Sequence, residues 1–145
     1  MENASSIDEV LEFAIAREVE AYQLYRYMAE QMQSPRLRQM CIELAEEELE
    51  HKAMLELEVM KIGRVVCDFD WSDYIMDAGE ELDMDYEQLL AFAIKKEDTS
   101  VKLYVELARI VNYAESRQTL LALADEEIEH RRRFEIEYNT LKEEY

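Results

Sequence analysis

The chain has 145 residues and a formal net charge of −19, from 16 Lys and Arg against 35 Asp and Glu. This length suits one domain, residues 1–145, whose core needs no disulfide support, and the negative charge opposes binding to nucleic acid or to anionic membranes while it attracts cations. Only 2 glycines and 1 proline leave few turns, which favours long helices.

Four long helices are predicted in chain order, each with apolar residues at helical spacing. They cover about residues 7–32, 35–62, 86–111 and 114–141. Ser34 can cap the start of the second helix and Pro35 can open it, while Gly63 marks its end. The predicted fold is therefore all-α, a four-helix bundle made of two helical hairpins.

A long crossover, residues 64–84, joins the second and third predicted helices. It is too long for a tight turn, so we expect the helices on either side of it to run parallel, a known bundle topology. The crossover is rich in apolar side chains, and its aromatic cluster is expected to seal a face of the bundle or to form a dimer contact, with substrate binding as the alternative. The apolar side chains are Val65, Val66, Phe69, Trp71 and Tyr74.

The two hairpins are copies of each other. Segment 6–58 recurs without a gap at 85–137, an offset of 79 residues. Ser6 with Glu9 and Asp85 with Gln88 occupy equivalent positions, and each is a capping-box pair that satisfies the first free amides of a helix.

Both histidines of the chain lie in the same E-x-x-H tetrad, one in each repeat, and each tetrad follows a further glutamate by thirty positions. The six residues are Glu18, Glu48 and His51 in the first repeat and Glu97, Glu127 and His130 in the second. A lone tetrad in an acidic helix is more often a surface ion pair. Helical phase decides otherwise here, because every member falls on the apolar stripe of its helix, as Glu18 does between Ile15 and Tyr22.

Six inward polar groups need neutralising partners. A buried carboxylate without a partner costs several kcal/mol or becomes protonated, and four at similar height would repel one another unless cations lay between them. Two divalent metal ions would balance the four carboxylates. Oxygen-rich, nitrogen-poor coordination favours iron or manganese over a structural zinc site.

These motifs resemble the di-iron domain of the rubrerythrins, in the ferritin-like superfamily, over nearly the whole chain. The matching positions are Ala14–Glu18 with Ala21 and Tyr25, Leu44-Ala45 with Glu48 and His51, Ala93–Glu97 with Tyr104, and Leu123-Ala124 with Glu127 and His130. The resemblance implies a ferritin-like bundle in which the six residues ligate two irons, with Glu48 and Glu127 as bridges and no catalytic residue beyond the metal centre. It also implies that Tyr25 and Tyr104 hydrogen-bond ligand carboxylates; the other interpretation is core packing.

The chain departs from the rubrerythrin pattern in two respects. Rubrerythrins add a rubredoxin domain with paired C-x-x-C motifs, whereas Cys41 and Cys67 lack that spacing, so we expect electrons from a separate protein such as a rubredoxin or from a small reductant. Rubrerythrins also tend to carry a carboxylate one turn after the third-helix glutamate. Here that position is Ser100, and its repeat equivalent is Ala21, which predicts a more symmetric site.

The predicted function is a non-haem di-iron oxidoreductase that reacts Fe(II) pairs with hydrogen peroxide or dioxygen, as in rubrerythrin-like detoxification. The alternatives are a ferroxidase that binds and stores iron, and a metal-free helical scaffold. We expect a cytoplasmic protein, because the sequence shows no signal peptide, membrane span or disulfide motif, and a homodimer.

Four further glutamates stand one helical step out of phase with the tetrads. They are interpreted as surface charges or as an iron entry route, and they are Glu47, Glu50, Glu126 and Glu129.

Overall fold

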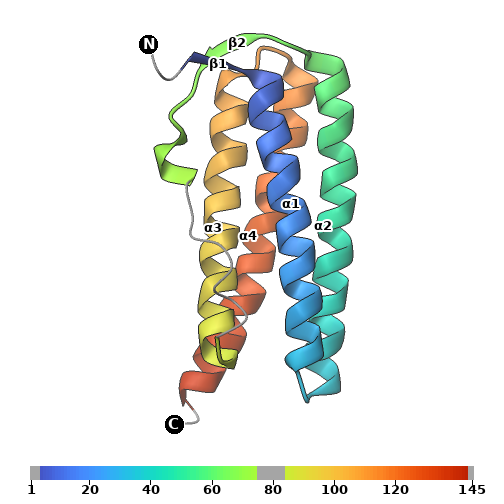
Figure 1. Ribbon diagram of the computed structural model, residues 1–145, viewed down its shortest axis with the longest axis vertical. Coiled ribbons are helices and arrows are strands. Elements are labelled where there is room, and N and C mark those ends of the chain that lie inside the picture. Colours follow the sequence, from blue (N-terminus) through green and yellow to red (C-terminus); the bar gives the residue numbers. More distant parts are fainter. Residues whose placement is uncertain (1–3, 75–83, 144–145) are drawn as a thin grey trace.

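The computed structural model describes residues 4–74 and 84–143. Four long helices form a bundle (Figure 1), and they are α1 (Ile7–Gln31), α2 (Pro35–Ile62), α3 (Tyr86–Ile110) and α4 (Ala114–Glu143). Helices α1 and α2 form one hairpin, α3 and α4 form the other, and α2 and α3 run in the same direction. The predicted all-α four-helix bundle and its parallel crossover are confirmed, with helix ends within two residues of the predicted ones.

Local signals at the helix ends act as the sequence predicts. The Glu9 carboxylate accepts hydrogen bonds from the backbone N–H and the hydroxyl of Ser6, at 2.8 and 2.9 Å. Asp85 and Gln88 form the reciprocal pair at the start of α3. At the end of α2, Gly63 has a φ of 71°, a conformation that glycine adopts without a steric cost.

A two-stranded sheet, which the helical pattern did not predict, ties the crossover to the start of the chain. Strand β1 (Ala4–Ser6) pairs antiparallel with β2 (Val66–Asp68), and the indole N–H of Trp71 donates to the hydroxyl of Ser5 at 3.0 Å. Strands of three residues are too short to show a periodic pattern. The rest of the predicted crossover, residues 75–83, lies outside the described residues.

The aromatic residues of the crossover pack on α1. Trp71 lies edge-on to Phe13, with ring centroids 5.1 Å apart, and Phe69 packs against both Trp71 and Tyr74. Phe69 is only 1% exposed. The prediction that this cluster seals a face of the bundle is confirmed, whereas a dimer contact stays a prediction.

The bundle interior consists of two apolar clusters with a polar layer between them. On α1 the two clusters meet on either side of Glu18, between Ala14 and Ala21. On α4 they meet between Ala124 and Phe134. The predicted polar residues of all four helices therefore lie at one height. In the described part of the chain, no helix is long and apolar enough to cross a membrane.

Candidate metal centre

The polar layer brings together all six residues that the sequence singled out. Helices α1 and α3 supply one glutamate each, and α2 and α4 each supply a glutamate and a histidine one turn apart. None of the six is more than 2% exposed, and they are Glu18, Glu48, His51, Glu97, Glu127 and His130. Because the site draws on every helix, only the assembled bundle can form it.

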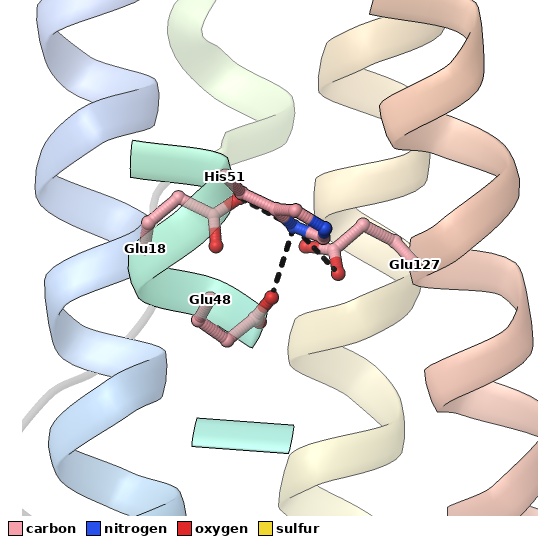
Figure 2. A group of neighbouring side chains, drawn as sticks. All are labelled: Glu18, Glu48, His51 and Glu127. Carbon is pink, nitrogen blue, oxygen red and sulfur yellow. Dashed lines mark ion pairs between the residues drawn. The ribbon is translucent and has the colours of Figure 1, made fainter. Parts of the chain in front are cut away.

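Around His51, three carboxylates converge on the same ring nitrogen (Figure 2). Its Nδ1 atom lies 3.1 Å from Glu48 Oε1, 3.5 Å from Glu127 Oε1 and 3.8 Å from Glu18 Oε2. Imidazole and carboxylate donors therefore face one another across a space where a cation can sit.

The second repeat builds the same arrangement around His130. Its Nδ1 atom lies 3.1 Å from Glu127 Oε1, 3.3 Å from Glu97 Oε2 and 3.6 Å from Glu48 Oε1. The two imidazole rings are nearly parallel, with centroids 5.7 Å apart. Glu48 and Glu127 thus belong to both candidate ligand groups, and within each group the ligand atoms lie within 4.8 Å of one another.

Several buried polar atoms of this layer have no hydrogen-bond partner among the described residues. Each of the six residues has at least one buried nitrogen or oxygen atom without a hydrogen-bond partner among the described residues, and both carboxylate oxygens of Glu127 are in this state. Folded proteins leave few buried polar atoms unpaired, because each costs about 1–3 kcal/mol. The donor set, carboxylate oxygen with imidazole nitrogen, fits a pair of iron or manganese ions.

The electrostatics of the two shared carboxylates support this fit. Burial raises the pKa of Glu48 and of Glu127 well above the ordinary glutamate value, and repulsion from the neighbouring carboxylates raises both further. Without metal, these shifts favour the protonated form of both groups. A pair of divalent cations would replace those protons and allow both carboxylates to ionise.

The same negative field also raises the pKa of both histidines. Burial lowers the pKa of His51, but the nearby Glu18 and Glu127 carboxylates outweigh it and raise the pKa to about 9. For His130, burial again lowers the pKa, while Glu127 and Glu97 raise it to about 11. Metal binding at neutral pH must therefore displace protons from both rings.

Two carboxylates interpreted as surface charges contact the histidines instead. The Nε2 atom of His51 lies 2.8 Å from Glu126 Oε1, and that of His130 lies 2.7 Å from Glu47 Oε1. These side chains are 51% and 39% exposed, so they cover the layer from the α2–α4 side. An acceptor at Nε2 leaves Nδ1 free to face inward as a metal ligand.

The contacts of Glu126 with His51 and of Glu47 with His130 pair each histidine with a glutamate of the other repeat. Helical phase alone does not predict this pairing, because the partners lie on different helices. Glu50 and Glu129 are exposed, as the sequence predicts. An iron entry route stays a prediction.

Two buried tyrosines brace the carboxylates of α1 and α3. The hydroxyl of Tyr25 donates to Glu97 Oε2 at 2.5 Å, and that of Tyr104 donates to Glu18. Burial, followed by repulsion from the glutamates, raises the pKa of both phenols well above the ordinary value. Both hydroxyls therefore remain protonated and act as donors. Each tyrosine holds the glutamate of the other repeat.

A cavity away from the polar layer is a weaker candidate for the functional site. It measures about 370 Å³ and lies between the start of α2 and the end of α4. Its two arginines, Arg36 and Arg133, pair with Glu137 and Glu43. None of its lining residues belongs to the unsatisfied polar layer.

Comparison with known proteins agrees with the site. The rubrerythrin family model matches residues 9–66 and again residues 88–145, so each match contains one E-x-x-H tetrad. No curated protein sequence gives a match.

Three solved structures share the fold. A hypothetical protein from Pyrococcus furiosus is 26% identical, with 95% of this chain and 91% of that chain covered and a TM-score of 0.76. A putative ferritin-like diiron-carboxylate protein from Thermotoga maritima is 21% identical, with 92% and 95% covered and a TM-score of 0.77. A manganese catalase from Anabaena is 19% identical, with 94% and 72% covered and a TM-score of 0.71.

Proposed function

Because the chain belongs to the rubrerythrin family, we propose that it is a non-haem di-iron oxidoreductase whose Fe(II) pair is oxidised by hydrogen peroxide or dioxygen. The observation that carries this proposal is the buried layer of four carboxylates and two imidazoles whose inward atoms lack partners. The likeness to a diiron-carboxylate protein and to a manganese catalase supports a redox metal pair. Manganese or a mixed pair would fit the same donors.

The two candidate ligand groups suggest how the residues divide between the metal ions. Glu18 and His51 would hold one ion and Glu97 and His130 the other, with Glu48 and Glu127 bridging. When bound, a ferrous pair supplies the two electrons that, with two protons, reduce hydrogen peroxide to two water molecules.

The surrounding residues would prepare the layer for this chemistry. Glu47 and Glu126 fix which histidine nitrogen faces inward, and the tyrosine hydroxyls hold the carboxylates of α1 and α3. The apolar clusters above and below exclude bulk water. In this proposal a separate donor such as a rubredoxin returns the electrons, and the cellular role is removal of peroxide or oxygen in the cytoplasm.

The proposal is tested by replacing the bridging carboxylates. Glu48→Ala and Glu127→Ala should each abolish binding of two Fe(II) ions per chain and the oxidation of Fe(II) in stopped-flow mixing with peroxide or oxygen. Glu46→Ala, an exposed change two positions from Glu48, serves as the control and should behave as the unchanged protein. Full iron binding and oxidation in both bridge variants would refute the proposal.

Ferroxidase and storage activity is the second candidate, favoured by the half-exposed Glu47 and Glu126 beside the histidines and by the charge of −19, which attracts cations. Iron accumulation beyond two ions per chain, within a cage of many subunits, would support it. Repeated turnover with an external reductant in a homodimer, the assembly that we propose, would support the oxidoreductase.

A further inference from the structure

The seam between α1 and α3 lies on the side of the bundle opposite to Glu47 and Glu126. It carries two positively charged side chains, called the seam cations. Arg17 and Lys96 are 79 positions apart and therefore occupy equivalent places in the repeat. Their side chains are only 14% and 10% exposed. Each directly precedes one of the proposed ligands, Glu18 or Glu97. Each of these two helices thus carries a positively charged side chain next in sequence to a proposed ligand.

One carboxylate at the surface covers both cations. The Oε1 atom of Glu20 lies 2.7 Å from Arg17 Nη1 and 3.3 Å from Lys96 Nζ. Glu20 is 47% exposed, so its side chain can move into solvent more easily than the buried cations can. The repeat places Thr99, not a second acid, at the position equivalent to Glu20.

A small cavity lies in the same seam. It measures about 10 Å³, which is room for roughly one water molecule. Its lining is Phe13, Arg17, Lys96, Thr99, Ser100 and Leu103. Ser100 lies one turn after Glu97, and Leu103 directly precedes Tyr104. The cavity is therefore lined by a residue one helical turn from Glu97 and by the sequence neighbour of Tyr104, the tyrosine that binds Glu18.

The α1–α3 seam is the side of the metal layer where a cavity lies beside positively charged and hydroxyl side chains. Histidine rings and their glutamate partners fill the α2–α4 side, and α1 with α2, like α3 with α4, pack closely as hairpins. The lining of the α1–α3 cavity has cations and hydroxyls, which bind small anions or hydrogen-bonding molecules.

The geometry points to the α1–α3 seam as the route by which a small anionic or hydrogen-bonding reactant reaches the metal centre. The side chains of Lys96 and Ser100 determine which molecules pass along the seam, and the Glu20 carboxylate covers the seam at the surface. This inference rests on the proposed di-iron function. It further implies that organic molecules do not reach the metal ions by this route, so an organic reductant delivers electrons from outside the bundle.

Azide, a small anion that binds ferric iron, probes the route without turnover. We expect Lys96→Met to slow azide association with the oxidised, iron-loaded protein by about tenfold, because the charge beside the route is lost. Lys95→Met removes the same charge at an exposed neighbouring position and should leave the rate unchanged. Equal association rates in the two variants would overturn the inference.

Two further variants separate passage from binding. Ser100→Val narrows the cavity without a charge change, so it should slow azide association and dissociation together and leave the Kd unchanged. Glu20→Gln removes the carboxylate from the surface and should speed association, whereas Glu12→Gln, an exposed change on the same helix, should not. Because Glu20 is exposed, this variant tests the route even if the Lys96 and Ser100 variants fail to fold. An unchanged association rate in Glu20→Gln would overturn the inference.

The same samples keep this inference separate from the proposed function. Iron content per chain is measured for every variant, and each iron-loaded ferrous protein is also mixed with peroxide and with oxygen. If neither oxidant reacts with the ferrous protein but the seam variants still change azide association as expected, the proposed function fails while the route stands. If oxidation is fast but substitutions at Glu20, Lys96 and Ser100 leave the rate of azide association unchanged, the function stands and the route fails.

Discussion

At the scale of single residues, the contacts of Glu47 and Glu126 explain how the two histidine rings are oriented. Each of these carboxylates approaches the outer nitrogen of a histidine on the facing helix, at 2.7 and 2.8 Å. The ring orientation that presents Nδ1 to the polar layer is therefore set across the α2–α4 side and not within one helix. Such outer partners tune both the geometry and the basicity of a metal ligand.

Neutralising these outer carboxylates should weaken metal binding. Glu47→Gln and Glu126→Gln are each expected to lower the affinity for Fe(II) or Mn(II) by about 10- to 100-fold, because the histidine loses its orienting acceptor. Competition with a chelator of known affinity measures the change. Glu50→Gln removes an equivalent exposed charge from α2 and should have little effect. An equal loss in all three variants would show that general surface charge, not the histidine contact, controls affinity.

At the scale of elements, the crossover works as a clamp on the α1 side of the bundle. Strand β2 pairs with β1, and Phe69 lies buried under Trp71 and Tyr74. The backbone oxygen of Tyr74 accepts a hydrogen bond from Arg17 at 3.0 Å. The crossover thus holds one of the two cations of the α1–α3 seam in place.

Removing the central aromatic of this clamp should destabilise the protein. Phe69→Ala is expected to lower the free energy of unfolding by about 3–5 kcal/mol, through lost burial and the cavity left behind. Val66 is 78% exposed, so Val66→Ala should change it by less than about 0.5 kcal/mol. Denaturant unfolding of the metal-free proteins gives both values. A Phe69→Ala cost as small as that of Val66→Ala would mean that the clamp contributes little to stability.

At the scale of the whole molecule, protons and metal ions compete for the same buried layer. Folding raises the pKa of His51 from 6.5 to about 9 and that of His130 from 6.5 to about 11. A raised pKa stabilises the folded state fully below the unfolded value of 6.5, and this contribution is lost as the pH rises through the folded values. The raised pKa values of Glu48 and Glu127 act with the same sign.

The metal-free protein should therefore lose stability as the pH rises from 6.5 to 9 and beyond, the window set by the histidine values. Metal ions replace the protons, so the gain in Tm on adding Mn(II) should grow over the same range. Thermal unfolding with and without Mn(II) at each pH measures this gain, and the paired comparison cancels the effect of the general negative charge. A gain that shrinks with rising pH would contradict the prediction.

The repeat and the helical phase in the sequence determine much of this protein. They set four helices, the parallel crossover and the inward direction of the six polar residues, because the period of a helix alone decides which side chains share a face. Neither the pairing of Glu126 with His51 nor the hydrogen bond from Tyr25 to Glu97 follows from that period. These contacts, the β1–β2 pair and the cavity between α1 and α3 depend on which elements are neighbours and at what height they meet. Only the tertiary structure decides that.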